Sequence, residues 1–174
     1  MLKRVRVPAF MLLLGGLAGV CCKLLDIYDT VQHFDMTLGE MFSQMSIWVL
    51  IGVLISVYSK TPKRAMCNVF PFCIGMLAAY YVTAEATHSV YGWSFIKGWT
   101  IFACFSPLFA YLTWMTKEQG WIPKLISLGI LAVTIGSSII FFGGPSIYDI
   151  IILLLLIYIL FFVKIKRRDK PSAK

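Results

Sequence analysis

Residues 38–58 read LGEMFSQMSIWVLIGVLISVY, and the basic segment SKTPKR follows at once as residues 59–64. A helix that crosses a lipid bilayer needs about 20 mainly apolar residues. Residues 38–58 supply such a run, and Glu40 is their only charged residue. Lys and Arg gather in the cytoplasmic loops of membrane proteins. This stretch therefore predicts a membrane-spanning helix whose C-terminal end faces the cytoplasm.

Five more apolar stretches of similar length lie on either side of this one, at residues 7–25, 62–82, 95–115, 123–142 and 147–163. Of the 174 residues, 59% are hydrophobic and 14% are charged, whereas soluble domains have about 45–50% apolar and about 25% charged residues. We therefore expect an all-α fold: a polytopic integral membrane protein whose single domain, residues 1–174, is a six-transmembrane-helix bundle. The composition argues against a soluble enzyme, a disordered chain and a disulfide scaffold.

The basic residues indicate how this bundle is oriented. With six spans, 14 of the 16 Lys and Arg residues lie on the side of the two termini, and only Lys23 and Lys97 lie on the other side. Six of the eight acidic residues lie opposite the termini. The distribution predicts a multi-pass protein of the cell (cytoplasmic) membrane with both termini in the cytoplasm. The net charge of +8 is then a topology signal, and we expect no nucleic-acid partner.

Three short motifs predict where helices begin. Residues 37–40 (TLGE) and 146–149 (SIYD) have the form of a capping box, in which the first side chain and the fourth bond each other's backbone N–H. Thr61 precedes Pro62, which suits the first position of a helix. The alternative interpretation is that these polar residues simply mark loops.

Prolines and small residues inside the spans predict bends and close contacts. Pro71 and Pro107 each remove one helix hydrogen bond, so we expect helix kinks there. The two kinks together could open a cavity, although prolines are common in membrane helices. Gly15 with Gly19, and Ala132 with Gly136, have the four-residue spacing of tight helix packing. Such pairs serve internal packing more often than the docking of a partner.

Polar residues gather at the outer ends of the first four spans, and they form our candidate substrate-binding site. We expect carboxylates there to meet the amine of a small polar solute, and lysines to meet its anion, with Trp48 and Trp99 on the floor. The alternative is a solvated rim with two lysines that extend to water. The candidate residues are Lys23, Asp26, Glu40, Gln44, Glu85, His88, Trp93 and Lys97.

The sequence favours no enzyme. His33 and His88 are the only histidines, so a histidine-rich metal site is excluded, and we expect no metal and no cofactor. Glu85-Ala86-Thr87-His88 is a single Glu-x-x-His motif, whereas a di-iron bundle needs two. Cys21-Cys22 lacks the two-residue spacing of a redox motif. An intramembrane enzyme is therefore the least favoured class, and we predict no catalytic residues.

In overall plan, with six spans, cytoplasmic termini and this length, the chain resembles the S components of energy-coupling-factor vitamin transporters. The resemblance implies a solute bound from outside and energy supplied by separate ATPase subunits. It also implies a docking face of small residues on the first helix; here Leu13 follows Ala9, and only Gly15 and Gly19 could serve.

Two functions are therefore weighed. The first is an integral membrane protein that binds or transports a small polar solute from the outer face. The alternative is a non-catalytic accessory, assembly or immunity protein that acts through helix–helix or cytoplasmic-loop contacts. The expected partners are the lipid bilayer, a small-molecule solute, and a membrane protein partner or further copies of the chain.

Overall fold

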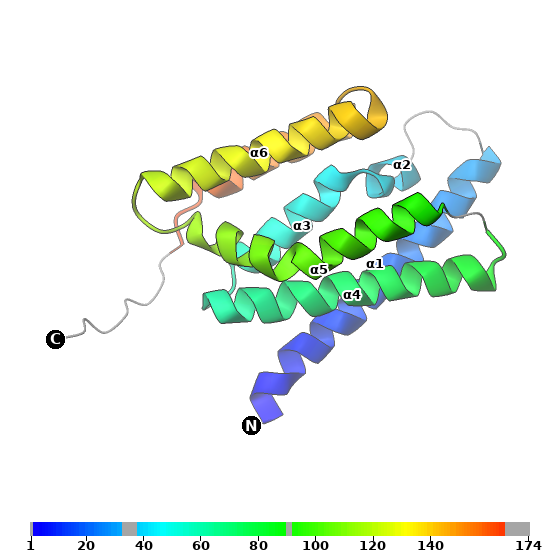
Figure 1. Cartoon of the computed structure of the whole chain (residues 1–174), viewed down its shortest axis with the longest axis horizontal. Helices are drawn as coiled ribbons and strands as arrows, with labels where there is room; N and C mark the ends of the chain where they lie inside the picture. The colour runs from blue at the N-terminus through cyan, green and yellow to red at the C-terminus, as the bar shows by residue number, and fades with distance from the viewer. Residues whose placement is uncertain (1, 33–37, 90–91, 166–174) are drawn as a thin grey trace.

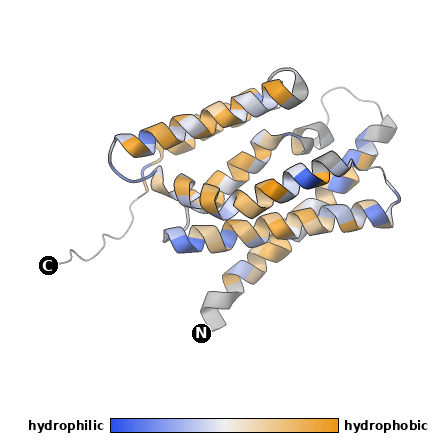
Figure 2. Ribbon diagram, in the orientation of Figure 1, coloured by the Kyte–Doolittle hydropathy of each residue, from blue (hydrophilic) through white to orange (hydrophobic). Residues whose placement is uncertain are grey.

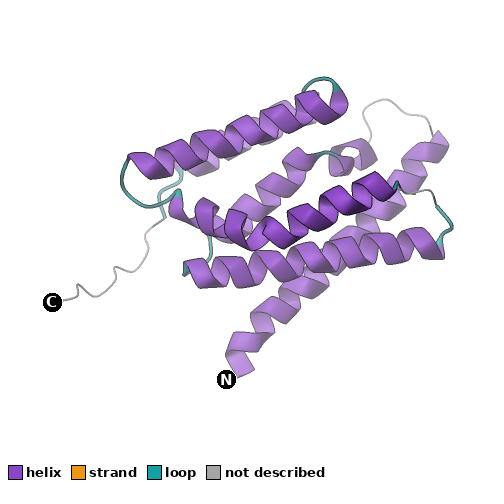
Figure 3. Ribbon diagram, in the orientation of Figure 1, coloured by secondary structure: helices purple, strands orange, loops and turns teal. Residues whose placement is uncertain are grey.

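The computed structural model describes residues 2–32, 38–89 and 92–165, and within these ranges the chain is all-α, as predicted. Figure 1 shows the arrangement and Figure 3 the secondary structure. The helices are α1 (Leu2–Gln32), α2 (Leu38–Ser43), α3 (Met45–Val57), α4 (Pro62–Ala86), α5 (Trp93–Met115), α6 (Trp121–Phe142), α7 (Ile147–Ile157) and the π-helical turn η1 (Tyr158–Phe162).

Three helical segments are long and apolar enough to cross a membrane: Val7–Asp29, Pro62–Ala86 and Trp121–Ile140. The segments Met45–Val57 and Ile147–Phe162 are apolar but shorter. Hydrophobic residues make up much of the helical ribbon in Figure 2, and several of the most hydrophilic ones lie near helix ends. These features are compatible with a membrane protein.

The predicted span 38–58 is two helices, which corrects the expectation of one continuous helix. The break is at Gln44, whose backbone is extended (φ −79°, ψ 149°) and which begins α3 as its N-cap. The break frees carbonyl groups at the end of α2. The indole Nε1 of Trp48 donates to one of them, the carbonyl oxygen of Phe42, at 2.8 Å. A side chain of α3 thus satisfies the backbone that the break exposes.

The helix-start motifs have different outcomes. The capping box of Ser146 and Asp149 is confirmed: Asp149 N donates to Ser146 Oγ at 3.2 Å, and Ser146 N donates to Asp149 Oδ2 at 2.9 Å. Thr61 caps α4 as predicted by accepting from Arg64 N at 3.2 Å. The motif at residues 37–40 lies outside the described residues, because Thr37 and the side chain of Glu40 are not described.

Successive long helices run in alternating directions (Figure 1). At one end, Trp114 Nε1 donates to the Ser59 carbonyl at 3.0 Å, and Lys117 Nζ donates to the carbonyl of Val163 at 2.9 Å. We call this the basic end, because the segments at residues 60–64 and 117–124 belong to it. The opposite end holds the last turns of α1 and α4 and the break between α2 and α3 (Figure 1).

Small residues bring α1 and α4 into close contact. A Cβ atom on Gly15 would meet the carbonyl oxygen of Phe72, and one on Gly19 would meet that of Met76. Reciprocally, a Cβ atom on Gly75 would meet the carbonyl oxygen of Leu12. Glycines on both helices therefore let the two backbones approach.

The second small-residue pair makes no such contact. Ala132 is exposed, and a Cβ atom on Gly136 would have no atom within 4 Å. Neither residue of this pair therefore brings the α6 backbone close to another described helix. We expected Ala132 and Gly136 to serve internal packing, and the structure shows no close helix contact at either residue.

Both prolines at which kinks were predicted lie in helices that continue past them. α4 runs through Pro71 and α5 through Pro107. Pro107 leaves the carbonyl of Ala103 without its usual backbone donor. Ser106 Oγ donates to that carbonyl at 2.7 Å, so the hydroxyl replaces the missing N–H. Near Pro71, the amide of Asn68 instead donates to Ser59 Oγ at 3.2 Å.

Candidate functional site

The eight predicted site residues do not form one pocket. They divide into an ion-pair cluster on α1, a polar cluster at the α2–α3 break, and an exposed rim. Of the seven whose side chains the structure describes, none lines either of the two cavities described below.

The first group is built around Lys23, whose side chain is buried at 1% exposure. Its Nζ donates to Asp26 Oδ2 at 2.7 Å and lies 5.1 Å from the centre of the Tyr80 ring. The Tyr80 hydroxyl donates to the same carboxylate oxygen at 3.1 Å. A buried ammonium group requires such a counter-ion. The Lys23 side chain therefore contacts Asp26 of α1 and Tyr80 of α4, and it does not face a solute.

The second group is at the start of α3. Gln44 is buried at 1% exposure, and its side chain faces Ser146 and Asp149, which begin α7. With the amide nitrogen toward Asp149, it donates to Oδ1 at 2.7 Å and to Oδ2 at 2.9 Å. This orientation satisfies both groups. Gln44 thus joins α3 to α7, away from the other predicted site residues.

Four of the five remaining predicted residues belong to the rim at the α4–α5 connection. Glu85 and His88 are exposed at the end of α4, and Trp93 and Lys97 are exposed on the first turns of α5. Glu40 lies in α2, and its side chain is outside the described part of the chain. Exposed groups of this kind are normal at the ends of membrane helices.

Another feature with the properties of a binding site is a cavity that is open on one side, where the exposed side chains of Phe109 and Val133 line it. This cavity has a volume of about 430 Å³ and lies between α3, α5 and α6, with two residues of α4 on its wall. We call it the central cavity. Its lining comes from Met45, Trp48, Val49, Gly52, Val53, Ser56, Val69, Cys73, Phe102, Ser106, Phe109, Ala110, Leu112, Thr113, Ile126, Gly129, Ile130 and Val133.

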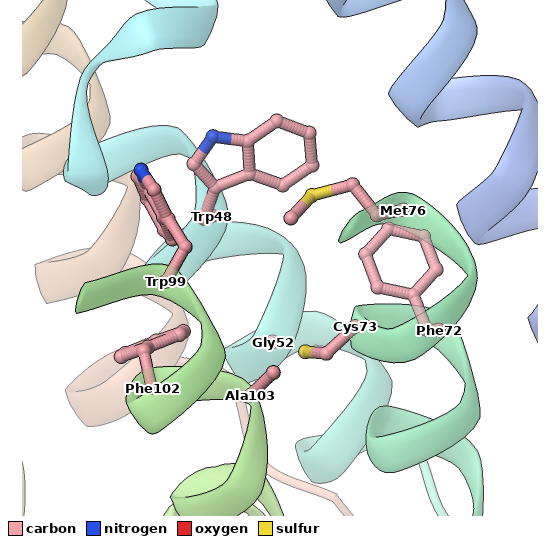
Figure 4. Close-up of a pocket in the computed structure, with 8 residues that line it drawn as sticks. All are labelled: Trp48, Gly52, Phe72, Cys73, Met76, Trp99, Phe102 and Ala103. Carbon is pink, nitrogen blue, oxygen red and sulfur yellow. The ribbon is translucent and has the colours of Figure 1, made fainter. Parts of the chain in front are cut away.

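A smaller space of about 20 Å³ adjoins it and shares the residues Trp48, Gly52, Cys73 and Phe102 (Figure 4). The close-up shows the rings of Trp48, Trp99, Phe72 and Phe102 around this space, with the sulfur atoms of Met76 and Cys73 between them. The two tryptophans that the sequence placed on the floor of a polar pocket are thus part of an aromatic wall.

The central cavity is apolar in its chemistry. Its few polar side chains include Ser56 and Ser106, whose hydroxyl groups donate to the carbonyls of Gly52 and Ala103 in their own helices, each at 2.7 Å. These hydroxyl oxygens can still accept a hydrogen bond, but their protons are already used. The site therefore suits a mainly apolar molecule, and any polar group on it should be a donor near Ser56 or Ser106.

Glycines create part of this space. Gly52 of α3 and Gly129 of α6 both line the cavity, and a Cβ atom on either would have no atom within 4 Å. Aromatic contacts hold the opposite wall: the rings of Phe102 and Phe109 are 5.6 Å apart, and those of Trp99 and Phe102 are 5.8 Å apart. The absence of side chains at these two glycines, together with the packed rings of α5, leaves the gap.

Sequence reasoning missed Tyr80, Asp149 and the cavity lining as parts of a site. The sequence offered no reason to single out Tyr80, and it pointed to Asp149 only as part of a capping box. The apolar lining residues could not be told from ordinary lipid-facing or packing residues by their type. The glycines at positions 52 and 129 were the one available signal, since a glycine inside a helix leaves room beside it.

Among the residues that the structure describes, no three His, Cys, Asp or Glu side chains gather closely enough to hold a metal ion. The chain matches no protein-family model, no curated protein and no solved structure. The geometry of the sites is therefore the basis for assigning a function.

Proposed function

We propose that this chain is a six-span integral membrane protein, with both termini in the cytoplasm, that binds a small and mainly apolar molecule in its central cavity. The observation that carries the proposal is the cavity itself. It measures about 430 Å³ and has an aromatic and aliphatic lining with a few hydroxyl groups. Ligand sites have volumes of about 300–1,000 Å³, are mostly apolar with few polar groups, and occur between the helices of bundles.

The membrane placement rests on charge as well as on hydropathy. Three helices are long and apolar enough to cross a bilayer, and two shorter apolar segments lie beside them. The lysines of the segments at residues 60–64 and 117–124 belong to one end of the bundle. This clustering supports a cytoplasmic location of the basic end, because Lys and Arg prefer the cytoplasmic side of membrane proteins.

The ligand class differs from the polar solute suggested by the sequence. A polar solute needs uncommitted charged or hydrogen-bonding groups that face a concave site. Lys23 is held by Asp26, and Gln44 is held by Asp149. Neither lines the central cavity. The chemistry of the cavity therefore favours an apolar ligand. A lipid-like molecule that enters from the bilayer would have this chemistry.

That the chain transports its ligand, and that it acts like an S component with separate ATPase subunits, stay predictions. The small-residue face that such a subunit would use for docking is Gly15 and Gly19, and α4 packs against both within the chain. A coupling partner would have to use another surface. The accessory role stays the alternative, and it predicts that filling the cavity leaves function unchanged.

Filling the cavity tests the proposal. Gly129→Phe places a ring where a Cβ atom has no neighbour within 4 Å and where the cavity wall is open. Gly136→Phe is the matched control, because it lies on the same helix, also has room for a Cβ atom, and does not line the cavity. Both proteins and the wild type would be extracted gently from the membrane and analysed by native mass spectrometry.

We expect the wild type and Gly136→Phe to retain an apolar small molecule, and Gly129→Phe to lose it. Gly52→Leu, on the facing helix, should also reduce the retained molecule. Equal occupancy in all four proteins, or no adduct in any of them, would overturn the cavity as a binding site.

A further inference from the structure

The central cavity lies mainly in the half of the bundle at the basic end. On α5, whose C-terminus belongs to the basic end, the lining runs from Phe102, near the middle of the helix, to Thr113, close to its last residue. On α4, which begins at the basic end, the lining residues are Val69 and Cys73, both in the first half of the helix. In a bilayer, the cavity would therefore lie at the depth of the leaflet on the basic side.

The cavity is elongated along the helix axes. Its lining runs from Met45 to Ser56 on α3, and from Phe102 to Thr113 on α5. At about 1.5 Å per residue, each of these stretches covers about 16 Å of helix. The hydrocarbon core of a bilayer is about 30 Å thick, so one leaflet contributes about 15 Å. The length of the cavity therefore matches the length of the acyl chains in one leaflet.

The open side of the cavity lies between α5 and α6. The side chains of Phe109 on α5 and Val133 on α6 line it, and they are 43% and 61% exposed. The outward surface of the same two helices is apolar, with Phe105, Leu125 and Leu128 each more than half exposed. In a bilayer, such a surface faces lipid chains. A chain could therefore pass from the bilayer into the cavity without contact with water.

The chemistry of the lining favours a hydrocarbon chain over water. A water molecule inside a protein needs several polar partners, and the hydroxyl protons of Ser56 and Ser106 already bond to carbonyls of their own helices. An empty space would cost the lining side chains their dispersion contacts on one side. A hydrocarbon chain restores those contacts and requires no hydrogen bond.

Positive charge lies at the end of the bundle where the headgroup of such a lipid would be. The exposed cationic side chains of the basic end are Lys60, Lys63, Arg64 and Lys124. In the part of the chain that the structure describes, Glu118 is the one acidic residue at this end. Basic side chains beside membrane helices attract anionic lipids. The charge of the basic end therefore complements a phospholipid with an anionic headgroup.

We propose that the central cavity holds one acyl chain of an anionic phospholipid from the leaflet at the basic end, and that the chain enters between α5 and α6 past Phe109 and Val133. The headgroup stays at the membrane surface, and the end of the chain points toward Trp48, which lines the cavity near the start of α3. This inference rests on the proposed function, because it names the class of ligand for the same cavity.

Brominated lipids test the proposal, because bromine quenches the fluorescence of a tryptophan close to it. The probe is phosphatidylglycerol with bromine atoms toward the ends of its chains, in nanodiscs that hold a protein whose only tryptophan is Trp48. Trp48 is 8% exposed, so lipid at the outer surface scarcely reaches it. We expect quenching in this protein and in its Gly136→Phe variant, and a loss of quenching in Gly129→Phe. Phosphatidylcholine with the same chains should quench less.

Native mass spectrometry of the protein with all its tryptophans, released from the same nanodiscs, keeps the test decisive if the Trp48-only protein does not fold. The wild type and Gly136→Phe should retain a molecule with the mass of the brominated lipid, and Gly129→Phe should lose it.

The outcomes separate this inference from the proposed function. A retained molecule of another mass, without quenching of Trp48, would overturn the acyl chain and leave the cavity as a binding site. No retained molecule in any of the proteins would overturn both. Equal quenching in Gly129→Phe would overturn the entry of the chain into the cavity, and equal quenching by the two lipids would overturn the anionic headgroup.

Discussion

Nζ of Lys23 lies 2.7 Å from Oδ2 of Asp26, one helical turn further along α1, and the lysine side chain is almost completely buried. Tyr80 of α4 donates to the same carboxylate oxygen. The three residues join α1 to α4 at the end opposite the basic end. Charged residues that the sequence suggested as ligands for a solute are thus ligands for each other.

The Lys23–Asp26 pair should be strongly coupled. Asp26→Ala leaves a buried ammonium group without its counter-ion, which should cost about 3 kcal/mol of unfolding free energy. The double variant Lys23→Met with Asp26→Ala removes both charges and should be more stable than Asp26→Ala alone. Equilibrium unfolding in mixed detergent micelles measures both. If removing Lys23 as well lowered the unfolding free energy further, as for two independent residues, the pairing would be contradicted.

The α1–α4 contact should tolerate no side chain at its glycines. Gly15→Leu places a Cβ atom against the backbone carbonyl of Phe72, so one helix must move. We expect a loss of about 1–3 kcal/mol, the usual cost of overpacking. Gly98→Leu is the control, since a Cβ atom there meets nothing within 4 Å. If both variants unfold like the wild type, the two helices do not pack closely.

Lys117 should stabilise the end of the last helix. Its Nζ donates to the carbonyls of Ile159, Leu160 and Val163, the latter two at 3.0 and 2.9 Å. Cations at a helix C-terminus are favourable, and hydrogen bonds to charged groups contribute about 1.5–3 kcal/mol. Lys117→Met should therefore lower the unfolding free energy by about 2 kcal/mol. Lys124→Met, at an exposed lysine, should not change it.

The proposed topology predicts which sites react from each side of the membrane. Single cysteines would be placed in a cysteine-free protein at four exposed positions: Lys60, Ala86, Glu118 and Pro145. In intact cells, a thiol reagent that cannot cross membranes should label only Ala86→Cys and Pro145→Cys. In inverted vesicles, it should label only Lys60→Cys and Glu118→Cys. Any other division would contradict six spans with cytoplasmic termini.

The sequence predicted the helices well because their boundaries are chemically marked. The capping box at Ser146 and the Thr61-Pro62 pair both begin helices at those residues. Long apolar runs between such marks leave little choice of secondary structure. The break at Gln44 was not predicted, because residues 38–58 are apolar enough to form one helix, and the break depends on bonds to Asp149 of a distant helix.

The candidate site was harder to predict, because a sequence does not say which polar groups satisfy each other. Lys23 and Gln44 look like free ligands until their partners Asp26 and Asp149 are placed beside them. The cavity is lined by apolar residues such as Phe109 and Ile130. A packed interior and a cavity are lined by the same apolar residue types. Only the way in which α5 and α6 pack in the folded protein shows that a space is left here.

The most direct test of the central claim is an experimental structure of the wild-type protein in nanodiscs made from its own membrane lipids, with a rigid antibody fragment bound to add mass. We expect density that belongs to no part of the chain, between α3, α5 and α6, in contact with Trp48 and Phe109. A bundle in which α6 closes against α5, with side chains filling the space and no such density, would contradict that claim.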